Sequence, residues 1–128
     1  MRSMFTQCAV FNHPISSWDT SNVIDMRRML EGTLAFDQPI GSWNVNAWNT
    51  VAVGDTPLTS GSAFSLSTAN YDALLVAWDA AYTFPSWPGG TVDFGSSQYS
   101  LTSPGNAVAT ARTNLANIWG TLNDGGGI

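Results

Sequence analysis

Residues 1–25 read MRSMFTQCAVFNHPISSWDTSNVID, and residues 26–50 read MRRMLEGTLAFDQPIGSWNVNAWNT. The two segments align without a gap at a period of 25 residues. Rare residue types recur in register, which indicates an internal repeat. The matched pairs are Met1/Met26, Arg2/Arg27, Met4/Met29, Phe11/Phe36, Pro14/Pro39, Ile15/Ile40, Ser17/Ser42 and Trp18/Trp43.

Each repeat has the length of one turn of a solenoid, in which neighbouring turns bury one another's apolar faces. The spacing of apolar residues predicts a short helix over residues 23–30, and the sequence after Pro39 favours a short strand over residues 40–45. Each buried aromatic side chain would stabilise the repeats by about 1.5–3 kcal/mol. The predicted repeat core consists of Phe11, Trp18, Met29, Phe36 and Trp43.

The chain changes character after the repeats. Residues 52–65 are rich in Gly, Ser, Thr and Pro, which predicts a connecting loop. Thr68 is a plausible N-cap for a helix whose apolar stripe reaches Tyr82, and Ser103-Pro104 starts a second helix that Gly120 ends. The inner face predicted for the second helix consists of Val108, Ala111, Leu115 and Ile118.

Short strands complete this second part. Residues 91–94 and 98–101 predict two strands around a turn, Thr121-Leu122 predicts a last strand, and residues 123–127 predict a frayed tail. We therefore expect two repeats over residues 1–51, and a connecting loop with a C-terminal cap over residues 52–128.

One repeat motif is long enough to compare with known families. Residues 36–45 read Phe-Asp-Gln-Pro-Ile-Gly-Ser-Trp-Asn-Val, and a related pattern runs from Met4 to Val23. This motif resembles that of the BspA-like leucine-rich-repeat surface proteins, and segments within residues 66–100 resemble the terminal part that often follows such repeats. The match is lost at residues 46–49, where Ser-Asn-Val would be expected, so the regular repeats are expected to end there. The predicted fold is α+β: a short leucine-rich-repeat-like solenoid of two repeats with an α/β C-terminal cap. The resemblance implies a role in adhesion and surface display.

The first repeat begins at Met1 without a capping segment. Solenoids usually need about three repeats and polar caps at both ends. We therefore expect Met1, Met4 and Phe5, together with part of Phe11, to be uncovered. These residues would face further repeats or another chain, in a homo-oligomer or a larger assembly.

The charge of the chain excludes several partners. The net charge is −5, and four arginines are the only basic residues. Nucleic-acid binding needs a cationic surface, which this chain cannot supply, and anionic membranes are disfavoured for the same reason. The longest apolar run, residues 73–78, is too short to span a bilayer. We predict no nucleic-acid binding and no membrane insertion.

Residues suited to catalysis are few and scattered. No pair of carboxylates is spaced as in a glycosidase or protease motif, and no phosphate-binding or nucleotide-binding motif is present. His13 is the single histidine and corresponds to Gln38 in the second repeat, while Cys8 has no second cysteine to pair with. We predict no catalytic residue, no cofactor and no metal site. Weak calcium binding at Asp25 and Asp37 and a hydrolase activity remain alternatives.

Two function classes fit these features. The first is a non-catalytic surface adhesion or binding module that contacts a protein or glycan, with Trp48, Trp87, Asp37 and Asn44 as partner-binding residues. The second is a structural protein that decorates or assembles a phage virion. The N-terminal residues form no apolar signal core, so we expect a fragment or a protein exported by another route. The predicted location is extracellular, at a cell surface or at a virion surface.

Overall fold

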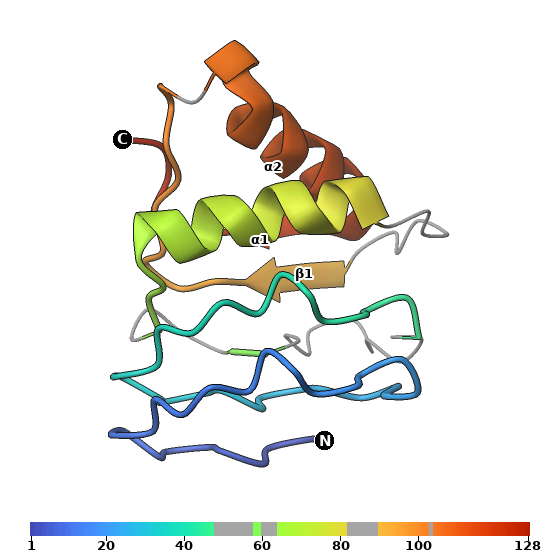
Figure 1. Cartoon of the computed structure of the whole chain (residues 1–128), viewed down its shortest axis with the longest axis vertical. Coiled ribbons are helices and arrows are strands. Elements are labelled where there is room, and N and C mark those ends of the chain that lie inside the picture. The colour runs from blue at the N-terminus through green and yellow to red at the C-terminus, as the bar shows by residue number, and fades with distance from the viewer. Residues whose placement is uncertain (48–57, 60–63, 82–89, 103) are drawn as a thin grey trace.

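Stacked turns of irregular chain form one part of the molecule, and two helices with a two-stranded parallel sheet form the other (Figure 1). The computed structural model describes residues 1–47, 58–59, 64–81, 90–102 and 104–128. The N-terminus lies at the lower end of Figure 1, and α2 lies at the upper end. In chain order the elements are α1 (Thr68–Ala81), β1 (Gly90–Asp93), a 3₁₀ turn (Pro104–Asn106), α2 (Ala107–Trp119) and β2 (Gly120–Asn123).

The first repeat lies alongside the second and runs parallel to it. The amino group of Met1 donates to the carbonyl oxygen of Asp25 at 2.9 Å, 24 residues further along the chain. In a parallel pair, an N–H group bonds to the residue that precedes its neighbour, so this offset corresponds to the 25-residue period of the sequence. Three more bonds follow the same offset: Ser3 N to Arg27 O, Phe5 N to Met29 O and Gln7 N to Glu31 O.

The predicted helix and strand inside the repeat do not form. Residues 23–30 contain no helix, because Arg28 has a left-handed φ of 55° and Oδ1 of Asp25 takes the backbone N–H of Arg27 in a local turn. Residues 40–45 contain no strand, because the N–H of Trp43 donates to the oxygen of Ile40 and closes a turn. The left-handed residues recur with the repeat: Ser3 (φ 54°) matches Arg28 (φ 55°), and Gln7 (φ 64°) matches Gly32 (φ 73°).

Helix α1 forms where its apolar stripe predicts it. The hydroxyl oxygen of Ser67 accepts the N–H of Asn70 at 3.4 Å, so Ser67 caps the helix and not Thr68. Tyr82 lies outside the described residues. The buried side chains of the stripe are Tyr71, Leu74, Leu75 and Trp78, as predicted.

Gly41 allows α1 to pack closely against the second repeat. A Cβ atom at this position would lie 3.2 Å from Cα of Leu74 and 3.3 Å from the carbonyl oxygen of Ala73. The backbone of α1 therefore rests on the turn that contains Gly41, and a side chain there would push the helix away. The first repeat carries Ser16 at the corresponding position.

Strand β1 pairs in parallel with β2, with Gly90 opposite Gly120 and Asp93 opposite Asn123. Helix α2 provides the connection that parallel strands require. The predicted pairing of residues 91–94 with 98–101 is therefore wrong. The predicted strand at Thr121-Leu122 is confirmed within β2.

The C-terminal tail is bonded to the chain, contrary to the predicted fraying. The N–H of Gly125 donates to the oxygen of Ser97 at 2.8 Å, and the N–H of Ile128 donates to the oxygen of Tyr99 at 2.9 Å. These bonds occupy the backbone of residues 97–101 that the predicted hairpin would have used.

Helix α2 ends where the sequence predicts, but it begins at Ala107 and not at the predicted Pro104, because Gly105 (φ 68°) and Asn106 (φ 57°) adopt left-handed conformations. Gly120 ends the helix with a φ of 88°, and its N–H donates to the oxygen of Ala116. Ser103 lies outside the described residues. Val108, Ala111 and Leu115 are buried, as predicted. Ile118 is only half-buried, and the neighbouring Trp119 is fully buried instead.

One apolar cluster runs from the repeats into the helical part. The ring of Phe36 in the second repeat stacks on Phe11 of the first repeat at a centroid distance of 5.8 Å and on Phe64, which follows the repeats, at 6.3 Å. In the helical part, Trp78 meets Trp119 edge-on at 6.1 Å. The predicted boundary between residues 51 and 52 lies outside the described residues.

Candidate functional site

The outer side of the first repeat exposes apolar side chains whose equivalents in the second repeat are buried. Five apolar positions are buried to 2% exposure or less in the second repeat, as Met26, Met29, Leu30, Phe36 and Trp43. The residues that occupy the same positions in the first repeat are half-buried or exposed. We call this surface the end face, and it consists of Met1, Met4, Phe5, Phe11 and Trp18.

Packing within the end face is aromatic. Phe5 stacks on Phe11 at a centroid distance of 4.0 Å and lies 5.9 Å from Trp18. Met4 is 50% exposed and Trp18 is 37% exposed. The prediction that Trp18 belongs to the core is wrong, because a second repeat lies on only one side of the first. Its counterpart Trp43 lies between the first repeat and the rest of the chain and is fully buried.

Two ion pairs lie within residues 25–31. Nη2 of Arg27 lies 2.7 Å from Oδ2 of Asp25, and this hydrogen-bonded guanidinium lowers the pKa of Asp25 to about 2. Arg28 lies 3.7 Å from Glu31. The end face itself carries no charged side chain, so its chemistry is that of apolar contact and neutral hydrogen bonding.

Two of the four predicted partner-binding residues, Asp37 and Asn44, lie in the described part of the chain. Trp48 and Trp87 lie outside the described residues. Asn44 is exposed, but its Oδ1 accepts the N–H of Asn46 and its carbonyl oxygen accepts the hydroxyl of Thr20.

Asp37 has an internal role that replaces the predicted contact with a partner. Its Oδ1 accepts the backbone N–H of Ser67 at 2.8 Å and Nδ2 of Asn70 at 2.9 Å, which ties the second repeat to the start of α1. Burial opposes ionisation of this carboxyl, but the hydrogen bonds from Asn70 and Ser67 outweigh it, so the pKa of Asp37 is lowered.

Replacing Asp37 by Ala is expected to lower the free energy of unfolding by about 1–2 kcal/mol, because the first turn of α1 loses a charged acceptor. Since the pKa of Asp37 is lowered from 3.8 in the folded state, its contribution is present above that value and is lost as the pH falls below it. Urea unfolding at pH 7 and in acid would measure both effects. Asp19→Ala is the matched control, because Asp19 is exposed and bonds only within its own turn to Ser21. An equal loss in both variants would contradict the assigned role.

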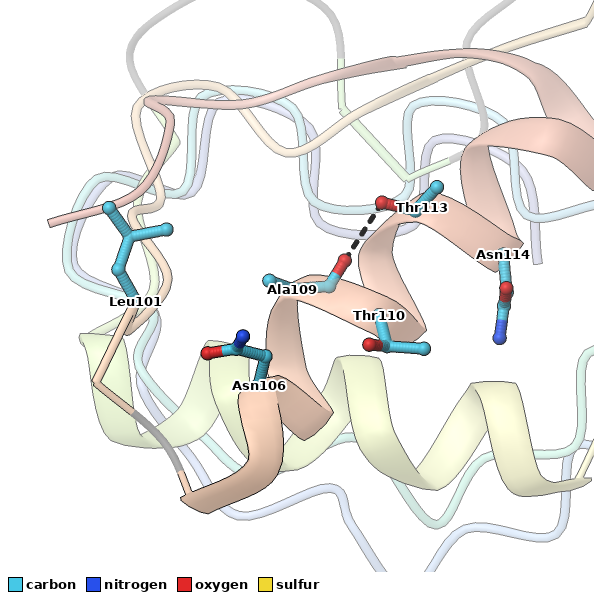
Figure 2. Close-up of a pocket in the computed structure, with 6 residues that line it drawn as sticks. All are labelled: Leu101, Asn106, Ala109, Thr110, Thr113 and Asn114. Atoms are coloured by element: carbon cyan, nitrogen blue, oxygen red, sulfur yellow. Dashed lines mark hydrogen bonds between the residues drawn. The ribbon is translucent and has the colours of Figure 1, made fainter.

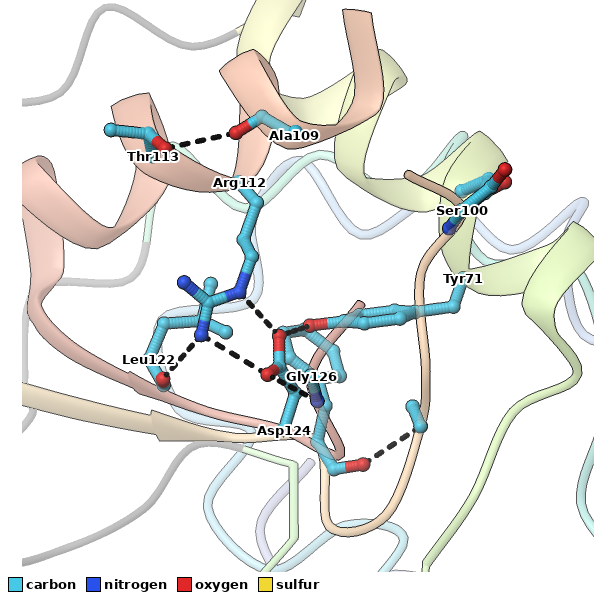
Figure 3. A network of polar contacts seen from close by, with 11 residues as sticks. Tyr71, Ser100, Ala109, Arg112, Thr113, Leu122, Asp124 and Gly126 are labelled. Atoms are coloured by element: carbon cyan, nitrogen blue, oxygen red, sulfur yellow. Dashed lines mark hydrogen bonds and ion pairs between the residues drawn. The ribbon is translucent and has the colours of Figure 1, made fainter. Parts of the chain in front are cut away.

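A buried polar network joins both helices to the C-terminal tail (Figure 3). Oδ2 of Asp124 accepts the hydroxyl of Tyr71 and Nε of Arg112, each at 2.8 Å, and Oδ1 accepts Nη2 of Arg112 at 3.0 Å. Burial, together with the charge of Asp124, raises the pKa of Tyr71 above its ordinary range. The guanidinium of Arg112 also lies 5.4 Å from the ring centre of Tyr99. All ionic groups in this network are satisfied, so its role is structural.

The sequence pattern does not indicate this network. Asp124 lies between Asn123 and three glycines, a composition that predicts a frayed tail. One signal could have indicated it: Arg112 is the single basic residue beyond the repeats, and it lies on a helix that is otherwise apolar and neutral.

A shallow depression on α2 offers no reactive group (Figure 2). Its lining consists of Leu101 and of small or polar side chains from the start and middle of α2, and Oγ1 of Thr113 is bonded to the oxygen of Ala109 at 2.9 Å. Across the described residues, no group of three or more His, Cys, Asp and Glu side chains could hold a metal ion. Among the same residues, no helix combines the length and apolarity needed to cross a bilayer.

The described chain thus belongs to the class of proteins that place tandem similar segments side by side and follow them with a helical part. Residues 1–77 match the family described as "Mycoplasma protein of unknown function, DUF285", and the chain belongs to that family. No curated protein and no solved structure matches the chain.

Proposed function

We propose that this chain is a non-catalytic surface module that binds a protein or glycan partner through its end face. In this proposal the repeats are turns of a short leucine-rich-repeat-like solenoid of the BspA-like type, and residues 66–128 cap it. The module acts outside the cell, at a cell surface or a virion surface.

The observation that carries the proposal is the contrast between equivalent residues. Met4 is 50% exposed, whereas Met29 is fully buried, and Trp18 and Trp43 differ in the same way. Exposed apolar patches bordered by polar groups are typical of interaction sites. A patch with three aromatic side chains and no charged side chain fits a protein surface or a sugar ring better than an ionic ligand.

The carboxylates support a binding role over a catalytic one. Asp25, Asp37 and Asp124 each accept hydrogen bonds that hold the fold together. Asp72 likewise accepts the N–H of Ser100 at 2.9 Å. A general acid or base needs a carboxyl that is free to exchange a proton with a substrate.

Met4→Asp is expected to lower partner binding at least about tenfold, because it places a charge in the apolar patch. The labelled chain would be tested on a glycan array and on intact animal cells. Val76→Asp is the matched control, since Val76 is 41% exposed on α1 and lies outside the end face. Equal binding by the two variants would contradict binding through the end face.

A structural role in a phage particle is the second candidate, and the uncharged end face favours it as well, because permanent assembly contacts are commonly apolar. The two candidates differ in where the end face would be covered. The backbone amide hydrogen exchange of residues 1–7 would be compared in the free chain and in purified particles. Exchange that is slow in the particles alone would favour the structural role.

A further inference from the structure

The exposed faces of the two helices differ in composition. The exposed side chains of α1 carry no hydrogen-bonding group: they are Ala69, Ala73, Val76, Ala80 and Ala81. Those of α2, apart from Ala107, all carry one: they are Thr110, Thr113, Asn114 and Asn117. Threonine and asparagine are weak helix formers, whereas alanine is the strongest. Helix α2 therefore displays neutral polar groups at a cost in helix stability that α1 avoids.

Several of these polar side chains line the depression on α2 (Figure 2). The depression has a volume of about 420 Å³, and small-molecule sites commonly enclose roughly 300–1,000 Å³. Leu101, which is 50% exposed, comes from the segment before α2 and adds a large apolar side chain to the lining. The other lining residues are small or polar, and none of them is charged: Asn106, Ala109, Thr110, Thr113 and Asn114.

Three of the lining side chains have hydrogen-bonding capacity to offer. Nδ2 of Asn114 donates to Oδ2 of Asp79 at 3.1 Å. Because a carboxylate can only accept, this bond fixes the orientation of the amide and leaves Oδ1 of Asn114 as an acceptor. The side chains of Asn106 and Thr110 have no hydrogen-bond partner among the described residues, and Asn106 does not cap α2. The depression therefore presents one oriented acceptor beside an amide and a hydroxyl that can each donate and accept.

This lining restricts the chemistry of the ligand. An ionic ligand would need an opposite charge, and a lipid chain would need a larger apolar lining than Leu101 provides. The centres of protein–protein contacts depend mainly on Trp, Tyr and Arg, none of which lines the depression. A neutral sugar ring fits the groups that are present, because its hydroxyls can pair with amides and hydroxyls and its C–H face can lie on a leucine side chain.

We infer that the depression on α2 is a second binding site of this chain, for a neutral pyranose sugar of a glycan. The side chains of Asn106 and Thr110 exchange hydrogen bonds with ring hydroxyls, and Oδ1 of Asn114 accepts from a third. Leu101 covers the C–H face of the ring. Helix α2 lies at the end of the molecule away from the N-terminus (Figure 1), so this site is separate from the end face and does not depend on the proposed function.

The test titrates the methyl glycosides of glucose, galactose, mannose and N-acetylglucosamine into the ¹⁵N-labelled full chain. Concentrations reach about 50 mM, since small neutral ligands with few contacts bind with dissociation constants on the order of 1 mM. With at least one sugar, we expect shift changes at the side-chain amides of Asn106 and Asn114. The double variant Asn106→Gly, Thr110→Ala is expected to weaken this binding at least about tenfold.

Both substitutions suit the fold, because glycine tolerates the left-handed φ of 57° at residue 106 and alanine favours the helix at residue 110. Asn117→Ala is the matched control, since Asn117 is exposed on α2 but does not line the depression. The urea midpoint verifies that each variant is folded. Should the double variant not fold, Thr110→Ala alone replaces it.

The absence of shift changes with all four sugars would overturn the inference, as would equal affinities of the double variant and Asn117→Ala. Shift changes that gather at Met4 and Trp18 instead would also overturn it, but they would support the proposed function, since the sugar would then occupy the end face. Loss of cell binding in the double variant without any response to a sugar would overturn it as well, because the occupant would then be a protein. Met4→Asp should leave the sugar titration at α2 unchanged.

Discussion

Trp43→Ala is expected to lower the free energy of unfolding by about 3–5 kcal/mol, one of the two largest effects that a single substitution should have in this chain. The indole of Trp43 is fully buried, and its Nε1 donates to the oxygen of Ile15 at 2.9 Å. Truncation leaves a large cavity and removes one of the hydrogen bonds that join the two repeats.

Trp18→Ala provides the control for Trp43→Ala, since it deletes the same side chain at the equivalent position of the first repeat. Trp18 is 37% exposed and its indole nitrogen has no bond to a described residue, so the expected loss is at most about 1.5 kcal/mol. Urea unfolding followed by far-UV circular dichroism measures both variants without depending on tryptophan emission. Similar losses in the two variants would contradict the proposed asymmetry of the repeats.

Asp124→Ala should cost about 3 kcal/mol, because it leaves the guanidinium of Arg112 and the hydroxyl of Tyr71 without their shared acceptor. The side chain of Asp124 is 1% exposed and that of Arg112 is 26% exposed, so solvent replaces only part of the lost interaction. The same substitution should lower the pKa of Tyr71, since the charge that opposes its ionisation is gone, although burial keeps it raised.

Asp79→Ala is the matched control for the Asp124 network. Oδ2 of Asp79 accepts Nδ2 of Asn114 at 3.1 Å and also joins α1 to α2, but this bond is exposed. Its loss should cost no more than about 0.5 kcal/mol. Urea unfolding measures both energies. Equal losses in Asp124→Ala and Asp79→Ala would contradict the stabilising role of the Asp124 network.

The helical part could be predicted from the sequence because its signals are local. The stripe that includes Tyr71, Leu74 and Trp78 has helical spacing, and Gly120 marks the end of α2. The parallel pairing of β1 with β2 was missed for the opposite reason. It joins residues 30 positions apart, Gly90 with Gly120, whereas the glycine and serines at 95–97 indicate a local hairpin.

The interior of the repeats could not be predicted by spacing alone. Residues 23–30 have helical periodicity, but Arg28 adopts a left-handed conformation that a non-glycine residue rarely takes. No helix-breaking residue type marks this position, and its carbonyl oxygen accepts the hydroxyl of Thr6 from the neighbouring repeat, a contact that spacing within residues 23–30 does not show. Exposure of the end face was expected at Met1, Met4 and Phe5, but Trp18 was assigned to the core because the repeat pattern makes it equal to Trp43.

The hydrogen bonds of the first repeat determine which parts of the fold a substitution in that repeat can affect. The hydrogen bonds that tie it to other described parts of the chain run to the second repeat, as in the bonds of Phe5 to Met29 and of Thr20 to Asn44. Substitutions at Met4 or Trp18 therefore leave the folding energy of the helical part almost untouched. Under the proposed function, binding and stability depend on separate groups of side chains, and such a separation allows a lineage to change its binding specificity by point mutation without first acquiring compensating changes elsewhere.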